Sequence, residues 1–87
     1  MPTLLPNEDV PRHALKGYRI FIFSHDHPHP AHVHFGKGRR VSSWDLVTVM
    51  CIDEGGFSSS EIREQRTILV EYRDEIWGAW HEHWQQQ

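Results

Sequence analysis

Five of the chain's eight histidines fall between His25 and His34, and this cluster holds the residue types most able to do chemistry. His32 and His34 are two residues apart, so on a β-strand their side chains point to the same face. Imidazole is the commonest protein ligand for zinc and similar divalent ions, so the pair predicts a divalent-metal site. Asp26 and His27 are the further candidate ligands, because a carboxylate can bind a metal itself or orient a ligand imidazole. The alternative is that all of these are surface and turn residues.

Cations close to the histidines suggest a second kind of chemistry. Arg39 and Arg40 follow the cluster in the sequence, and Arg73 falls within the apolar stripe of a predicted helix. Histidines beside cations suit phosphodiester cleavage, in which one imidazole takes a proton, another gives one, and a cation stabilises the developing charge. Arg39, Arg40 and Arg73 are therefore candidate anion-binding residues. The alternatives are a solvated hairpin tip for the first two and structural pairing with a carboxylate for Arg73.

Composition limits the class of protein more than it identifies a function. The 87 residues carry a formal net charge of −3, so there is no global basic field to attract nucleic acid. The single cysteine, Cys51, lies in an apolar run and is interpreted as a buried small hydrophobic residue. The sequence has neither a signal-peptide pattern at its start nor an apolar stretch of ~20 residues, so we expect a cytoplasmic protein with no membrane partner.

The elements that must position the cluster are predicted from periodicity and turn residues. Residues 17–23 form an unbroken apolar run rich in β-branched and aromatic side chains, which indicates a central strand covered on both faces. Residues 32–35 and 40–46, extending as far as 52, supply two more strands after turns at Pro28–Pro30 and Gly36–Gly38. The expectation is a three-stranded antiparallel β-meander, preceded by an irregular N-terminal arm over residues 1–16.

A helix is predicted to begin after Ser58. Ser58 followed by Glu61 is a capping box, and Phe57 with Ile62 is the matching hydrophobic staple. The apolar residues recur at helical spacing, so one long helix over residues 58–84 would pack one face on the sheet over residues 17–52. The fold class is therefore α+β, in a single domain spanning residues 1–87. Because Phe21 and Phe23 make the second face of the sheet apolar too, we expect a homodimer or a partner protein over that face.

The chain resembles the bacterial family called domain of unknown function 4160. The resemblance rests on matching pieces along nearly the whole chain: Met1-Pro2-Thr3, Asp26-His27, Pro28, Pro30, His32-Val33-His34, Trp44-Asp45, Gly56-Phe57-Ser58 and Ala79-Trp80-His81-Glu82. Four residues, Pro28 to Ala31, stand where the family has three. The family has no established activity. Its toxin–antitoxin-like gene arrangements imply a small partner protein, and RNA as a possible target.

Three hypotheses follow. The first is a component of a toxin–antitoxin-like or stress system with a divalent-metal site at His32, His34 and Asp26 or His27. The second is a metal-independent ribonuclease-like enzyme that uses its histidines as acid and base. The third is a structural protein-interaction module without a chemical site. The sequence does not decide between an enzyme and a binding protein.

Overall fold

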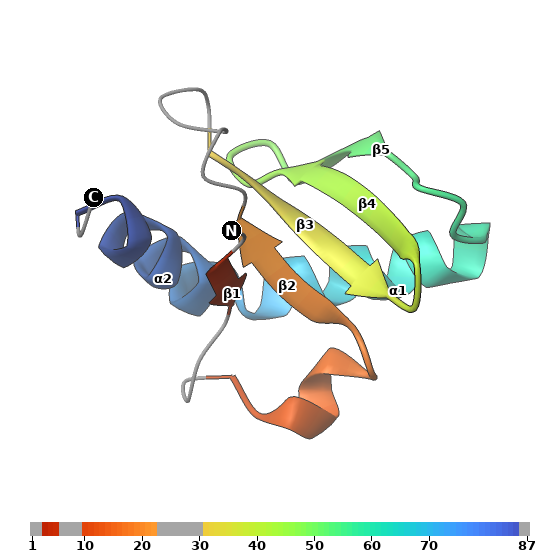
Figure 1. Ribbon diagram of the computed structural model, residues 1–87, viewed down its shortest axis with the longest axis horizontal. Coiled ribbons are helices and arrows are strands. Elements are labelled where there is room, and N and C mark those ends of the chain that lie inside the picture. The colour runs from red at the N-terminus through yellow and green to blue at the C-terminus, as the bar shows by residue number, and fades with distance from the viewer. Residues whose placement is uncertain (1–2, 6–9, 23–30, 86–87) are drawn as a thin grey trace.

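The computed structural model describes residues 3–5, 10–22 and 31–85, and it is an α+β fold with the helices on one face of an antiparallel sheet (Figure 1). Among these residues, five strands lie in sequence order across the sheet: β1 (Thr3–Leu5), β2 (Arg19–Ile22), β3 (His32–Lys37), β4 (Arg40–Asp45) and β5 (Met50–Asp53). A short 3-10 helix, η1 (Arg12–Leu15), joins β1 to β2, and the helices α1 (Ser59–Glu71) and α2 (Arg73–Gln85) follow the sheet. Every strand pair is antiparallel and formed by chain neighbours, as the predicted meander requires.

The prediction of three strands and an irregular N-terminal arm was wrong. β1 pairs with β2, with Leu4 opposite Phe21, and therefore makes residues 3–5 an edge of the sheet. The apolar segment Thr3 to Leu5 is too short, and too close to Pro2 and Pro6, to stand out as a strand from local pattern alone. β2 is an inner strand with buried side chains on both faces, as its apolar run indicated.

The predicted third strand is divided by a turn over residues 46–49. Asp45 makes this turn, because its Oδ1 accepts hydrogen bonds from the backbone N–H of Val47 (2.8 Å) and Thr48 (3.0 Å). Val49 then takes a left-handed φ of 57°, a rare conformation for a β-branched residue. These local side-chain hydrogen bonds outweigh the strand propensity of Val47, Thr48 and Val49, so the segment reverses and returns as β5.

The prediction of one long helix was also wrong, since the helix is interrupted at Tyr72. Tyr72 has φ −110° and ψ 24°, outside helical values, although its N–H still donates to the Ile68 carbonyl at 2.9 Å. Neither Pro nor Gly marks the break in the sequence. The interruption accompanies a tertiary contact that the sequence did not predict: α2 packs beside β1, at the opposite edge of the sheet from the start of α1 (Figure 1).

The core lies between the sheet and the two helices. Alternate residues of the inner strands point into it, and their side chains are at most 1% exposed: Ile20, Ile22, Val33, Phe35, Trp44. Leu69 and Ile76 close the core from α1 and α2, and both are also fully buried. Among the described residues, no helix combines the length and the apolar character that a membrane crossing requires.

Two polar side chains of the described residues, Gln65 and Ser42, are fully buried in this core. The side chain of Gln65 on α1 is fully buried, and its Oε1 accepts hydrogen bonds from Ser42 Oγ (2.5 Å) and Trp44 Nε1 (3.0 Å). The helix is thereby tied to β4 at two neighbouring positions. These two hydrogen bonds fix the position of α1 on the sheet, while the buried Nε2 of the same side chain has no hydrogen-bond partner among the described residues.

The predicted capping box is confirmed at the start of α1. The Glu61 backbone N–H donates to Ser58 Oγ at 3.2 Å, and the Ser58 N–H donates to Glu61 Oε1 at 2.9 Å. We expect Ser58→Ala to lower the free energy of unfolding by about 1 kcal/mol, because one N-terminal N–H loses its acceptor. Urea denaturation measures this, with Ser59→Ala, one residue inside the helix, as the matched control. Equal stability of the two variants would contradict the capping role.

Candidate functional site

The histidine pair lies on the sheet face away from the helices. Along β3, Val33 and Phe35 point into the core, so His32 and His34 share the outer face with Gly36. The register of the β3–β4 hairpin places Ser43 opposite His34 and Asp45 opposite His32. The strand on the other side places Phe21 opposite His34.

The two imidazoles are close and differently oriented. Their ring centroids are 5.6 Å apart, and the ring planes meet at 72°. His34 is only 8% exposed and stacks on the Phe21 ring at 5.7 Å, while its Nδ1 lies 3.3 Å from Ser43 Oγ. His32 is half-buried. The packing therefore holds the His34 ring in one orientation, and the His32 ring meets it in an edge-to-face contact.

Asp45 adds a negative charge beside His32. The pKa of Asp45 lies below its ordinary value, chiefly because its carboxylate accepts a hydrogen bond from the Thr48 backbone N–H. The Val47 N–H acts in the same direction, and so does the nearby charge of His32. A carboxylate that stays ionised beside an imidazole favours cation binding at this position.

Two of the four predicted metal ligands can be placed. His32 and His34 are brought together as expected, whereas Asp26 and His27 lie outside the described residues. In the part of the chain that the structure describes, no group of three or more His, Cys, Asp or Glu side chains is arranged to hold a metal ion. The described residues thus supply a pair of imidazoles with a neighbouring carboxylate.

The predicted anion-binding residues do not converge on the histidines. Arg40 forms an ion pair with Glu61 on α1 at 2.9 Å and lies over the Phe57 ring. Arg73 donates to the Val47 carbonyl at 2.7 Å. Arg39 lies at the β3–β4 turn, beyond the end of β3 farthest from His32, and five residues of strand span roughly 16 Å.

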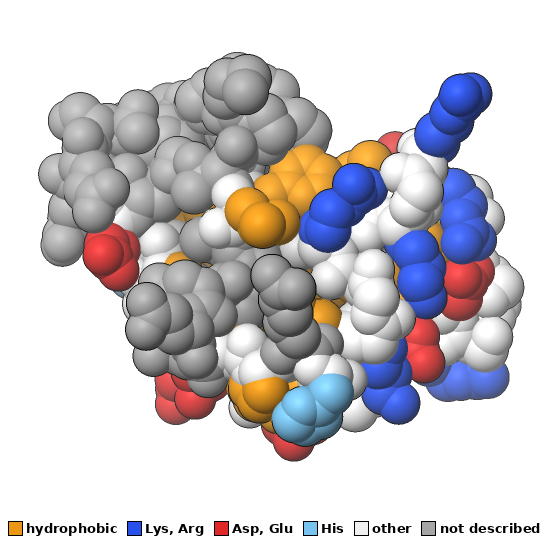
Figure 2. Space-filling view, turned by 60° about the horizontal axis from the view of Figure 1, so that its bottom comes forward, with side chains coloured by type: hydrophobic (Ala, Val, Ile, Leu, Met, Phe, Trp, Pro, Cys, Tyr) orange, Lys and Arg blue, Asp and Glu red, His pale blue; other side chains and the backbone are white. Residues whose placement is uncertain are grey.

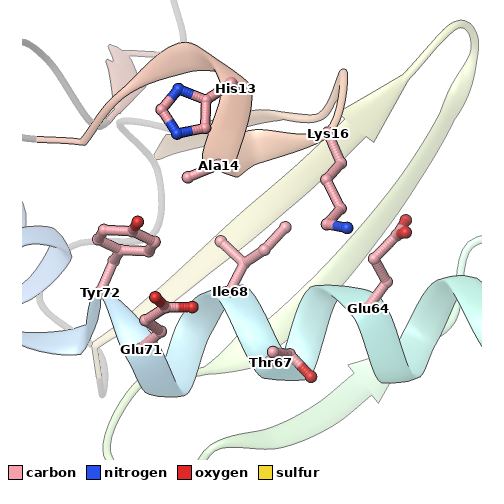
Figure 3. Close-up of a pocket in the computed structure, with 8 residues that line it drawn as sticks. All are labelled: His13, Ala14, Lys16, Glu64, Thr67, Ile68, Glu71 and Tyr72. Atoms are coloured by element: carbon pink, nitrogen blue, oxygen red, sulfur yellow. The ribbon is translucent and has the colours of Figure 1, made fainter.

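A separate cleft lies between η1 and α1 (Figure 3). Its volume is about 440 Å³, and its lining residues are His13, Ala14, Lys16, Glu64, Thr67, Ile68, Glu71 and Tyr72. At one end, Glu64 accepts a hydrogen bond from the Tyr18 hydroxyl at 2.7 Å. Burial raises the pKa of Tyr18 to about 12, and the hydrogen bond to Glu64 acts in the same direction. The sequence contains no motif that would have pointed to this cleft.

Sequence reasoning missed Ser43 and Asp45 as neighbours of the histidines. The signal was present in the hairpin, because a two-residue loop fixes which residues face each other. Gly38 takes the positive φ of 62° that the first position of a type II′ turn requires, and Lys37 then pairs with Arg40. The turn predicted at Gly36–Gly38 lies instead at Gly38 and Arg39, and the predicted turn gives the wrong partners for His32 and His34.

Comparison with known proteins gives one match. A family model described as Domain of unknown function (DUF4160) matches residues 17–81. No curated protein and no solved structure matches the chain significantly. The matched range includes His32, His34, Ser43 and Asp45, and it leaves out β1 and η1.

Proposed function

The chain belongs to the DUF4160 family, and from its own geometry we propose that it binds a divalent metal ion, zinc or a similar one, through His32 and His34. The observation that carries the proposal is the pair of imidazoles on one face of β3, with ring centroids 5.6 Å apart. Two imidazoles on one tetrahedral zinc, with Zn–N distances of ~2.0–2.1 Å, have their centroids roughly 5 Å apart. Only a small adjustment of the half-buried His32 is needed to reach that spacing.

The neighbours of the pair support the same chemistry. A ligand histidine is usually oriented by a hydrogen bond at its second ring nitrogen, and Ser43 Oγ stands at Nδ1 of His34. His34 would therefore bind the metal through Nε2. The ionised Asp45 beside His32 adds the negative charge that favours a cation. Asp26 and His27 remain the predicted further ligands.

The test is a calorimetric titration of tag-free protein with Zn²⁺ and with Ni²⁺. We expect one equivalent to bind, and we expect His32→Ala to weaken the affinity by about 100-fold or more, because a ligand is lost. Ser43→Ala, which removes only the orienting contact, should weaken it by roughly 10-fold.

His13→Ala is the matched control, since His13 is exposed on η1 and far from the pair in the fold. It should bind metal as the wild type does. Thermal unfolding of each variant without metal separates loss of a ligand from loss of the fold. Wild-type binding that is absent, or that survives His32→Ala unchanged, would refute the proposal.

The ribonuclease-like alternative is less well supported by the geometry. It needs a cation near the imidazoles, whereas Arg40 and Arg73 are engaged elsewhere and Arg39 lies at the far end of the hairpin. Cleavage of RNA in the presence of a chelator, with a bell-shaped pH profile, would nevertheless decide in its favour. The third hypothesis, a structural interaction module, predicts that His32→Ala with His34→Ala leaves partner binding intact.

The biological setting proposed here is a toxin–antitoxin-like or stress system, with a small partner protein or a second copy of the chain. The exposed apolar side chains Leu4, Val47, Met50 and Ile52 support an interaction at the sheet edges or turns. Co-purification with the product of the neighbouring gene, and light scattering of the protein alone, distinguish the two kinds of partner.

A further inference from the structure

Four cations from two distant segments come together at the end of the β2–β3–β4 sheet. We call Lys16, Arg19, Lys37 and Arg39 the basic hairpin end. Pairing of β2 with β3 places Arg19 opposite Gly36. This pairing brings Lys16 and Arg19 beside the β3–β4 turn, where Lys37 and Arg39 lie. Figure 2 shows Lys and Arg side chains gathered over one half of that view. From the sequence, only Lys37, Arg39 and Arg40 formed a group.

Specific contacts hold two of these cations, Arg19 and Lys37, in place. Arg19 Nη2 donates to the Gly38 carbonyl at 3.0 Å, and Lys37 Nζ lies 4.4 Å from the centroid of the Tyr18 ring. Gly36 makes room for the Arg19 side chain, because a Cβ there would stand 3.0 Å from Arg19 Nη2. The glycine at position 36 of β3 therefore leaves space for the Arg19 guanidinium on this face of the sheet.

Among the described residues, none of the four cations at the basic hairpin end forms an ion pair with a carboxylate. An ion pair near this end joins Arg40 to Glu61, and neither belongs to the group of four. Glu64 lines the neighbouring cleft with Lys16 and accepts the hydrogen bond from Tyr18. Glu71 lines the same cleft, so the four cations stand beside two carboxylates and leave a net positive region among the described residues of a chain whose overall formal charge is −3.

From this arrangement we infer that the basic hairpin end binds the phosphate backbone of a nucleic-acid duplex. A protein partner usually meets an apolar centre within a polar rim. The large exposed hydrophobic side chains of the described residues lie elsewhere, on β1, the β4–β5 turn, β5 and α1. Base stacking on single strands needs an exposed aromatic ring, and Tyr18 is only 3% exposed. Cations alone match phosphates, so binding is expected to be independent of sequence.

The test measures fluorescence anisotropy of labelled DNA and RNA duplexes of ~20 base pairs, about two helical turns, with a chelator present throughout. The patch variant combines Lys16→Gln with Arg39→Gln, two exposed residues. We expect it to weaken binding at least ~10-fold, and to make the slope of log K against log salt shallower by about two. The two duplex arms show whether DNA or RNA is preferred.

The matched control combines Arg63→Gln with Arg66→Gln, two exposed residues of α1 outside the group of four, and it changes the net charge equally. It should keep the wild-type slope, with thermal unfolding confirming that both variants are folded. Equal losses in the two variants would overturn the inference, because overall charge alone would then explain binding. So would the absence of wild-type duplex binding at roughly 50 mM salt. Binding of polyglutamate without binding of either duplex would instead assign the surface to an acidic protein.

Discussion

Gln65→Leu is expected to lower the free energy of unfolding by about 2–5 kcal/mol, although leucine has nearly the same size and is apolar. The substitution removes the oxygen that accepts hydrogen bonds from Ser42 Oγ and Trp44 Nε1. Both donors are fully buried, and each buried donor left unpaired costs roughly 1–3 kcal/mol. The substitution also removes the buried Nε2 of Gln65, which has no hydrogen-bond partner among the described residues, and this offsets part of that sum. For 87 residues the whole stability is about 4–13 kcal/mol, so the loss is a large fraction of it. Urea denaturation followed by far-ultraviolet circular dichroism measures the difference.

A double-mutant cycle with Ser42→Ala separates this mechanism from simple repacking. Alone, Ser42→Ala should cost about 1 kcal/mol, because Gln65 keeps its bond from Trp44. In the Gln65→Leu background it should instead recover about 1 kcal/mol or more, since it removes a buried hydroxyl that has already lost its acceptor. If Gln65→Leu were as stable as the wild type, the network would have no role in holding α1.

Gly55→Ala is expected to lower the free energy of unfolding more than Gly38→Ala does, although both replace a glycine in a turn or loop. Gly55 follows β5, and a Cβ at this position would stand 1.8 Å from the carbonyl oxygen of Val41 on β4. No side-chain movement relieves an overlap with backbone, so the loop or the strand must shift. Adding the cost of φ +60° for a residue with a Cβ, we expect a loss of about 4 kcal/mol or more, measured by urea denaturation.

Gly38→Ala is the control that isolates the overlap. Gly38 has φ +62°, almost the same as Gly55, but nothing lies within 4 Å of its Cβ position. Its cost should be the conformational part alone, about 1–2 kcal/mol, and the variant should remain folded. Similar stabilities of Gly55→Ala and Gly38→Ala would show that the close approach to Val41 does not constrain the fold.

The sequence predicted the parts of the fold that depend on strong local signals. The capping box at Ser58 and Glu61 and the inner strand around Ile20 are both confirmed. The errors lie in segments whose secondary structure depends on pairing with a distant part of the chain, or on the hydrogen bonds of a single side chain. β1 exists through its pairing with β2, and the β4–β5 turn exists because Asp45 binds the backbone of Val47 and Thr48.

For the candidate site, the spacing of His32 and His34 was enough to predict a shared face of a strand. It was not enough to find Ser43 and Asp45, because their positions depend on the hairpin register. A turn at Gly36–Gly38, in place of the observed turn at Gly38 and Arg39, changes the residue opposite every position of β3. The cation cluster around Arg39 was recognised only in part, since Lys16 and Arg19 join it through the β2–β3 pairing.

The order of elements along the chain has a consequence for synthesis on the ribosome. All five strands precede both helices, and each strand pairs with the one made just before it. The sheet can therefore assemble while the chain is still growing, at ~5–20 residues per second, before Leu69 and Ile76 have emerged. During that interval the face that carries Val33, Phe35 and Trp44 has no helix to cover it. A chain cut short before α1 would present this apolar face to chaperones and proteases.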